Sequence, residues 1–224
     1  MSTYHKLITV AAVFLLLALG GINPVFGKTL VYKEVTSDKN ITTEVITNKL
    51  KNGYEIKKIQ SDKYDATIYT DASFSTLKID MYRPGDGTVL AERRGDKVFI
   101  TINPNGKDGI SKQEAKISSD LPWYQDWGLQ LKAFIVSDKE TTEFWSLGPK
   151  KWRAGKYIIK KENVELLEIN NQKVEAIHAK VTLSGWKKKL WSGDMWFRKS
   201  DGIFLLSKMN PFSSKDYIQF VEEK

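Results

Sequence analysis

The chain has 224 residues, a formal net charge of +8 at pH 7, no cysteine and two histidines. Without cysteine, disulfides, a thiolate nucleophile and a zinc ribbon are excluded, and so few histidines argue against a histidine-rich metal site. We therefore predict no metal and no other cofactor. The basic charge suits anionic surfaces such as lipid headgroups, although a well-solvated surface with more lysine than glutamate explains it equally well.

The first 27 residues have the pattern of a secretory leader. Lys6 supplies a positive charge near the start, and Leu7–Leu19 forms an apolar run of suitable length. Gly20, Gly21 and Pro24 then end the helix of this run. We predict a signal peptide at 1–27 and a single exported domain at 28–224, in the periplasm or outside the cell. The alternative is an uncleaved anchor in the inner membrane. Because nucleic acid is not expected outside the cytoplasm, we predict no nucleic-acid partner.

Beyond the leader, the sequence consists mostly of short alternating segments separated by turn signals, which is typical of antiparallel β-structure. Asn52-Gly53 is among the strongest hairpin signals, because both positions can adopt positive φ. The expected strands are Thr29–Thr36, Ile41–Leu50, Tyr54–Gln60, Ala66–Thr70, Thr76–Arg83, Val89–Arg94, Lys97–Ile102, Glu143–Leu147, Lys156–Lys161, Val164–Ile169, Lys173–Leu183, Trp186–Trp191, Met195–Arg198, Ile203–Met209 and Tyr217–Val221.

The pattern changes between the two halves of the chain. Ser118–Asp120 supplies N-cap candidates, and the chain then continues to Ser137 with Gly128 as its only breaker, which predicts a helix. An aromatic stripe at i, i+4, i+8 and i+11 runs along this helix and consists of Trp123, Trp127, Leu131 and Phe134. Such a stripe indicates packing against a sheet, and the alternative is that it lines an apolar ligand cavity.

These elements together predict a mainly β fold. We expect a single curved antiparallel sheet, a half-barrel or open barrel of about ten strands, packed around one central Trp-rich helix.

Two patches mix aromatic and basic residues. One spans residues 150–153 and the other spans residues 186–191. Indole rings favour the membrane interface and lysines favour anionic headgroups, so we predict contact with a membrane surface or a ligand headgroup through Trp152, Arg153, Trp186, Lys188 and Trp191. The alternative is that 186–191 is a strand that divides its lysines between two faces, where their stems cover apolar surface.

The sequence offers no catalytic signature. His178 is the only histidine beyond the leader, and no Gly-x-Ser-x-Gly elbow accompanies it. Strand alternation predicts that His178 points away from the core together with Ala176 and Lys180. We predict no catalytic residue and a non-enzymatic protein.

The C-terminal third carries a characteristic pair of strands. An alternating strand at Lys173–Leu183 is followed by Gly193–Leu206, in which an aromatic strand, a charged Asp-Gly turn and an apolar strand succeed one another. Over residues 156–206 the chain resembles the periplasmic lipoprotein-carrier and lipid-binding proteins of bacteria and related uncharacterised secreted domains. The resemblance implies an open, strongly curved half-barrel that wraps around helical segments and holds acyl chains in its concave face. The best-known carriers begin with a helix, whereas this domain begins with a strand at Thr29.

We therefore expect an exported protein that binds a lipid, a lipoprotein acyl chain or another amphiphile at the cell envelope. The aromatic stripe would contact this ligand. One alternative is an envelope scaffold or sensor that binds a protein partner through a sheet edge. Another is a carbohydrate-acting hydrolase with two carboxylates across a cleft.

Overall fold

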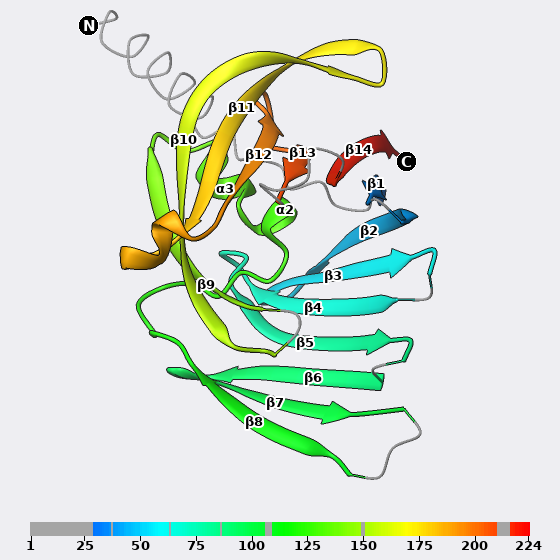
Figure 1. Ribbon diagram of the computed structural model, residues 1–224, viewed down its shortest axis with the longest axis vertical. Coiled ribbons are helices and arrows are strands. Elements are labelled where there is room, and N and C mark those ends of the chain that lie inside the picture. The colour runs from blue at the N-terminus through cyan, green and yellow to red at the C-terminus, as the bar shows by residue number, and fades with distance from the viewer. Residues whose placement is uncertain are drawn as a thin grey trace, which may run out of the picture.

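The computed structural model describes residues 29–36, 38–62, 64–85, 87–105, 109–148, 151–209 and 216–224. The predicted leader at 1–27 lies outside these residues. Fourteen strands form one antiparallel sheet in the described part of the chain (Figure 1). No helix in these ranges is both long and apolar enough to cross a membrane.

The strands follow one another with short connections, apart from a longer segment in the middle of the chain. They are β1 (Thr29–Val35), β2 (Asn40–Leu50), β3 (Gly53–Gln60), β4 (Asp65–Asp71), β5 (Thr76–Arg83), β6 (Gly87–Arg94), β7 (Lys97–Asn103), β8 (Ser111–Lys116), β9 (Thr141–Leu147), β10 (Ala154–Ile169), β11 (Gln172–Leu183), β12 (Ser192–Arg198), β13 (Phe204–Lys208) and β14 (Tyr217–Glu223).

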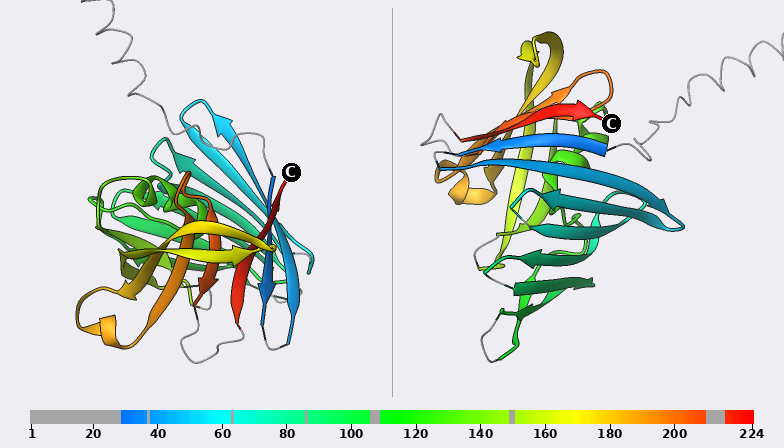
Figure 2. Two further views of the ribbon diagram at one scale, coloured as in Figure 1. Left: turned by 90° about the horizontal axis from the view of Figure 1, so that it is seen from above. Right: turned by 90° about the vertical axis from the view of Figure 1, so that its right-hand side faces the viewer.

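Consecutive strands pair with each other throughout the sheet except β8 and β9, and the first strand also pairs with the last. The order across the sheet is β8-β7-β6-β5-β4-β3-β2-β1-β14-β13-β12-β11-β10-β9. Leu30 of β1 lies opposite Glu223 of β14, and the two strands lie side by side in Figure 2. The sheet is therefore a meander joined through its first and last strands, and β8 and β9 are its outermost strands.

The predicted fold class is confirmed, because the chain forms a mainly β structure with one curved, open antiparallel sheet. The prediction of about ten strands was too low. The sequence analysis missed β8, in which Ala115 is the only apolar side chain, so the strand shows no alternation of apolar and polar residues.

The helical segment is much shorter than predicted. Two four-residue turns, α2 (Trp127–Gln130) and α3 (Lys132–Ile135), replace the helix expected from Ser118 to Ser137. Asp126 caps α2, and its Oδ1 accepts a hydrogen bond of 3.1 Å from the backbone N–H of Leu129. The residues before Asp126 instead pair with strands, because hydrogen bonds to the sheet override the local helical pattern.

The core lies between the concave face of the sheet and the segment that carries α2 and α3 (Figures 1 and 2). Burial alternates along strands such as β4, as the period of two requires. The largest fully buried side chains are Trp123, Phe144, Phe197, Ile56, Ile79, Ile100, Leu131, Ile135, Leu147, Ile159, Met195 and Leu205.

The turn between β2 and β3 requires a glycine for steric reasons. A Cβ at Gly53 would lie 1.8 Å from the carbonyl oxygen of Thr70, whereas a Cβ at Gly95 would meet nothing within 4 Å. We expect Gly53→Ala to lower the free energy of unfolding by about 3 kcal/mol or more. Gly95→Ala, which only places alanine in a left-handed turn at φ 63°, should lower it by about 1 kcal/mol. Urea denaturation of both variants would measure the difference, and equal losses would contradict the steric explanation.

Candidate functional site

Residues 122–124 connect two distant parts of the sheet. The backbone N–H of Trp145 in β9 donates to the carbonyl oxygen of Pro122 at 2.8 Å. The backbone N–H of Tyr124 donates to the carbonyl oxygen of Trp145, also at 2.8 Å. On the other side, Thr76 N–H at the start of β5 donates to the carbonyl oxygen of Trp123 at 2.7 Å. This segment therefore links β9 to β5, and it fixes the chain that leads into α2.

The side-chain amide of Gln130 holds α2 in place. Gln130 is 1% exposed, and its Oε1 accepts hydrogen bonds of 2.7 Å from the backbone N–H groups of both Gln125 and Asp126. Its Nε2 donates to Thr76 Oγ1 at 2.9 Å and to the carbonyl oxygen of Phe74. One buried side chain thus ties the end of α2 to its own beginning and to the turn before β5.

The turn between β4 and β5 presents Phe74 in a strained conformation. Phe74 has a φ of 66°, which costs a non-glycine residue about 1–2 kcal/mol. The carboxylate of Asp71 stabilises the turn, because its Oδ1 accepts from the backbone N–H groups of Ser73 at 2.8 Å and Ser75 at 2.9 Å. The Phe74 ring stacks on Tyr54 with centroids 4.1 Å apart.

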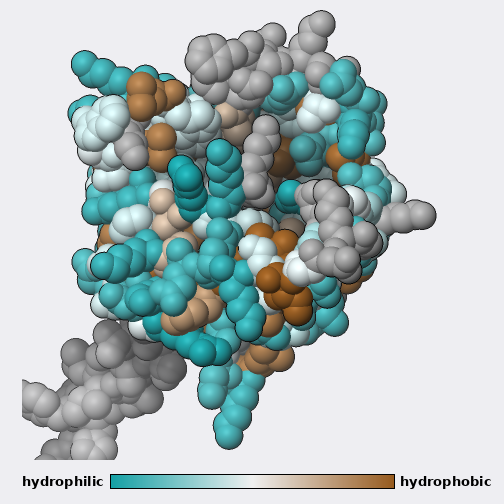
Figure 3. Space-filling model, turned by 60° about the horizontal axis from the view of Figure 1, so that its bottom comes forward, coloured by the Kyte–Doolittle hydropathy of each residue, from teal (hydrophilic) through white to brown (hydrophobic). Residues whose placement is uncertain are grey.

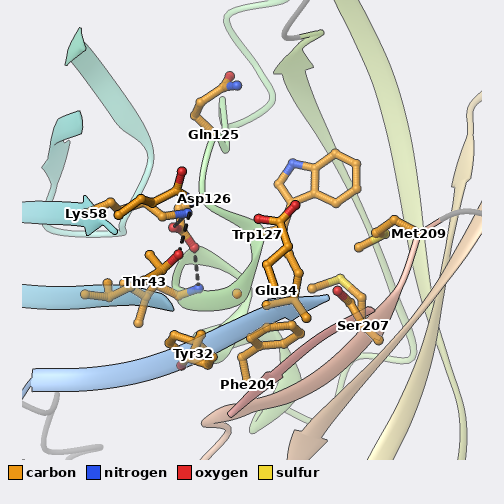
Figure 4. Close-up of a pocket in the computed structure, with 16 residues that line it drawn as sticks. Tyr32, Glu34, Thr43, Lys58, Gln125, Asp126, Trp127, Phe204, Ser207 and Met209 are labelled. Atoms are coloured by element: carbon orange, nitrogen blue, oxygen red, sulfur yellow. Dashed lines mark hydrogen bonds and ion pairs between the residues drawn. The ribbon is translucent and has the colours of Figure 1, made fainter. Parts of the chain in front are cut away.

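Two cavities adjoin α2. We call the first the polar cavity; it has a volume of about 180 Å³ and appears in Figure 4. It is lined by Tyr32, Glu34, Thr43, Val45, Lys58, Gln60, Gln125, Asp126, Trp127, Gly128, Leu129, Met195, Phe204, Ser207, Met209 and Ile218.

We call the second the apolar cavity; it has a volume of about 290 Å³. It is lined by Leu30, Thr47, Tyr54, Ala72, Ser73, Phe74, Gly128, Leu129, Lys132, Ala133, Gly202, Ile203 and Phe204. Gly128, Leu129 and Phe204 belong to both linings. A Cβ at Gly128 would lie 3.1 Å from the Phe204 ring, so these residues form a thin partition between the two spaces.

An ion pair lies in the wall of the polar cavity. Lys58 Nζ is 2.8 Å from Asp126 Oδ2 (Figure 4). Burial alone would lower the pKa of the Lys58 ammonium, but the Asp126 carboxylate outweighs that effect and raises the pKa above its ordinary value. Because Asp126 also caps α2, the ion pair attaches the beginning of α2 to β3.

Tyr32 contributes a polar group without a partner to the same region. Its side chain lines the polar cavity, and burial, together with the Asp126 charge, raises the pKa of its hydroxyl. Among the described residues, no donor or acceptor pairs with this buried hydroxyl. A buried polar group without a hydrogen bond costs about 1–3 kcal/mol, so leaving this hydroxyl unpaired is unfavourable for the fold.

The structure brings only one member of the predicted aromatic stripe to a cavity. Trp127 lines the polar cavity, and its indole N–H donates to Ser146 Oγ at 3.1 Å. Trp123, Leu131 and Phe134 are buried in the core and line neither cavity. Trp123 belongs to an isolated bridge with Trp145 rather than to a helix, so the four side chains do not form one stripe.

The sequence analysis missed the residues that surround the apolar cavity. Tyr54, Phe74, Leu129 and Phe204 come from distant parts of the chain, and each fits an ordinary strand, turn or helix pattern. Among the cavity residues near Leu129, only Gly128 gives a local sequence signal, because glycine often marks a place where two segments approach closely.

The residues predicted to contact headgroups occupy different environments. Trp152 is buried, whereas Arg153 is exposed. Trp186 and Lys188 are exposed, and Trp191 is partly buried against the core. The strand expected at Trp186–Trp191 was wrong, because a 3₁₀ helix at Gly185–Lys189 begins there with Gly185 at a φ of 71°.

His178 lies in a polar cluster and lines neither cavity. Its Nε2 is 2.8 Å from Asp194 Oδ1, and its ring stacks on Trp196 with centroids 4.8 Å apart. Ala176 was predicted to share the outward face of His178, but it is buried. Beside His178, a bulge in β10 shifts the pairing register between Lys161 and Asn163. No group of three or more potential metal ligands occurs in the part of the chain that the structure describes.

Comparison with known proteins shows a likeness of fold. No family model matches the sequence, and no curated protein matches it. A β-barrel-like protein of a domain of unknown function, DUF1849, from Brucella abortus has a TM-score of 0.53 at 8% identity, over 88% of this chain and 96% of its own. The two proteins therefore share a β-barrel-like fold.

Two further solved structures are similar over most of their length. The hypothetical lipoprotein YmcC from Escherichia coli has a TM-score of 0.40 at 12% identity, over 95% of this chain and 96% of its own. A protein with a YmcC-like fold from Bacteroides fragilis has a TM-score of 0.33 at 12% identity, over 89% and 96% of the two chains.

The role of Gln130 can be tested by removing its hydrogen bonds while keeping its approximate shape. Gln130→Met leaves the N–H groups of Gln125 and Asp126 buried without their acceptor. We expect the free energy of unfolding to fall by about 3 kcal/mol. Gln172→Met, at an exposed position in β11, should change it by less than about 0.5 kcal/mol. Chemical denaturation measures both, and a loss at Gln130 no larger than that at Gln172 would show that α2 does not depend on these bonds.

Proposed function

We propose that this protein is an exported, non-enzymatic binding protein that holds an apolar or amphipathic ligand, such as a lipid or a lipoprotein acyl chain, within its curved sheet. The observation that carries this proposal is the apolar cavity of about 290 Å³ beside α2, separated from a polar cavity by a thin partition. Its volume is close to the lower limit of about 300 Å³ for small-molecule sites.

The two cavities together suit an amphiphile. Aromatic and aliphatic side chains, including Tyr54, Phe74 and Ile203, would surround an acyl chain in the apolar cavity. Beyond the partition, the Lys58–Asp126 pair offers charged groups to a polar headgroup. Leu129 is only partly buried and lines both spaces, so a change of its side-chain rotamer would join them.

A non-enzymatic role is supported by the chemistry of the two cavities. The only charged side chains in the polar cavity are Glu34, Lys58 and Asp126, and the last two already form an ion pair and a helix cap. A carbohydrate-acting hydrolase would need two carboxylates facing each other across a substrate. Asp126 is committed to Lys58 and to α2, so this alternative has less support.

The sheet edges give less support to a protein-binding scaffold. The β8 edge carries Lys112, Glu114 and Lys116, and charged side chains of this kind discourage the addition of another strand. The β9 edge already pairs with residues 122–124 through Trp145. We therefore favour a ligand inside the sheet over a protein at its edge. The proposed location outside the cytoplasm rests on the leader pattern at residues 1–27.

Native mass spectrometry with lipid extraction, on protein purified from its export compartment, tests this function directly. We expect a co-purifying amphiphile. For binding in vitro, palmitate and a lysophospholipid serve as probes of tail and headgroup recognition. A ligand-free mass together with no uptake of either probe would contradict the proposal.

A substitution at the partition should separate cavity binding from binding elsewhere. Leu129→Trp places a larger side chain in the partition and reduces the free volume of the cavities. We therefore expect probe occupancy to fall about tenfold or more, equivalent to about 1.4 kcal/mol of binding free energy. Leu77→Trp makes the same change at an exposed position outside both cavities and should leave occupancy unchanged. Equal occupancy in the two variants would place the ligand outside the cavities, provided both unfold at the wild-type temperature.

A further inference from the structure

The connection between β11 and β12 exposes two large apolar side chains, those of Trp186 and Leu190. We call residues 185–191 the basic loop; it begins with the 3₁₀ helix at Gly185–Lys189 and projects from one end of the β10–β11 pair (Figure 1). Trp186 is 78% exposed, more than any other large hydrophobic residue among those described, and Leu190 is 61% exposed. The face in Figure 3 shows the usual pattern, in which small hydrophobic patches lie among hydrophilic side chains. An exposed tryptophan and leucine within one short loop indicate an interaction surface.

The charges of the basic loop are all positive. Residues 187–189 are lysines, and no acidic residue occurs between Ser184 and Gly193. Lys188 and Lys189 are exposed and form no ion pair with any described residue. Lysines in nearby strands differ in this respect, since Lys156 pairs with Glu143 and Lys160 with Glu162. The positive charge of the loop is therefore available to an anionic partner.

We propose that the basic loop docks on the surface of an anionic phospholipid bilayer. Tryptophan prefers the headgroup level of a membrane, and clustered lysines are attracted to anionic headgroups. Stable membrane attachment commonly combines a modest apolar insertion with a basic patch, and the basic loop carries both. The net charge of +8 on the whole chain adds a long-range attraction to the same surface.

The basic loop is firmly attached to the wall of the polar cavity. The Trp191 ring packs edge-on against Trp127 at 6.2 Å and against Tyr157 at 5.9 Å. A Cβ at Gly193 would lie 2.5 Å from Met209 Sδ and 3.3 Å from the Trp191 ring, so both side chains pack against the start of β12. Trp127 and Met209 line the polar cavity (Figure 4). Docking through the basic loop would therefore bring this wall close to the bilayer. If the cavities hold an amphiphile, as the proposed function states, that ligand would then lie next to the membrane surface.

Vesicle co-sedimentation of the purified full-length protein tests the docking. The probes are phosphatidylcholine vesicles with and without phosphatidylglycerol. We expect binding to the anionic vesicles to be about tenfold stronger or more, since each lysine near the surface contributes, and to weaken as salt increases. Equal binding to the two kinds of vesicle, or no binding to either, would overturn the proposal.

Matched variants assign any binding to the loop. Trp186→Ser with Leu190→Ser removes the apolar contribution, and Lys188→Gln with Lys189→Gln removes charge. Each pair should weaken binding about tenfold or more. The controls are Ile110→Ser with Leu166→Ser, which are similarly exposed, and Lys51→Gln with Lys112→Gln, which change the net charge equally. Loop variants that bind as well as their controls would overturn the proposal.

Ligand occupancy, measured by native mass spectrometry, distinguishes this proposal from the proposed function. Loop variants with wild-type probe occupancy and lost vesicle binding are the expected result. Wild-type vesicle binding in the loop variants, with probe uptake intact, would reject the docking surface and leave the cavity assignment standing.

Discussion

An isolated helical turn of four residues is not stable in water, because the nucleation of a helix is unfavourable and few hydrogen bonds repay it. The turns α2 and α3 each have this length, so their position depends on tertiary contacts. The amide of Gln130 supplies these contacts on one side, and the Lys58–Asp126 pair supplies them on another. The partition at Leu129, and with it the division of the interior into two cavities, therefore depends on a few buried polar groups.

Two features that serve different purposes meet at Trp127. Its indole ring belongs to the lining of the polar cavity, and the same ring supports Trp191 at the end of the basic loop. The aromatic contacts from Trp127 to Phe144, Tyr157 and Trp191 form a continuous cluster. The proposed binding site and the proposed docking surface thus share a rigid wall, so the orientation of one determines the orientation of the other.

The sequence predicted the sheet well, because alternation and turn signals are local and nearly every strand pairs with its neighbour in the chain. The Asn52-Gly53 turn illustrates this, since it connects β2 and β3 as expected. The helix from Ser118 to Ser137 was wrong because Trp123 pairs with Trp145, a partner that no local pattern reveals. The apolar cavity was beyond prediction for the same reason, since Tyr54 and Phe204 are brought together only by the curvature of the sheet.

The pairing of β1 with β14 has a consequence for how the chain acquires its structure. Thr29 and Lys224 exchange backbone hydrogen bonds of 3.1 and 2.9 Å, so the two halves of the meander join only when residues at opposite ends of the chain meet. Contacts of such large sequence separation form slowly, because loop-closure entropy opposes them. During synthesis, the strands β1–β8 would emerge with an unfilled hydrogen-bonding edge at β1. Until β14 has been synthesised, that edge is open to pairing with other chains, and the protein is most vulnerable to aggregation during this interval.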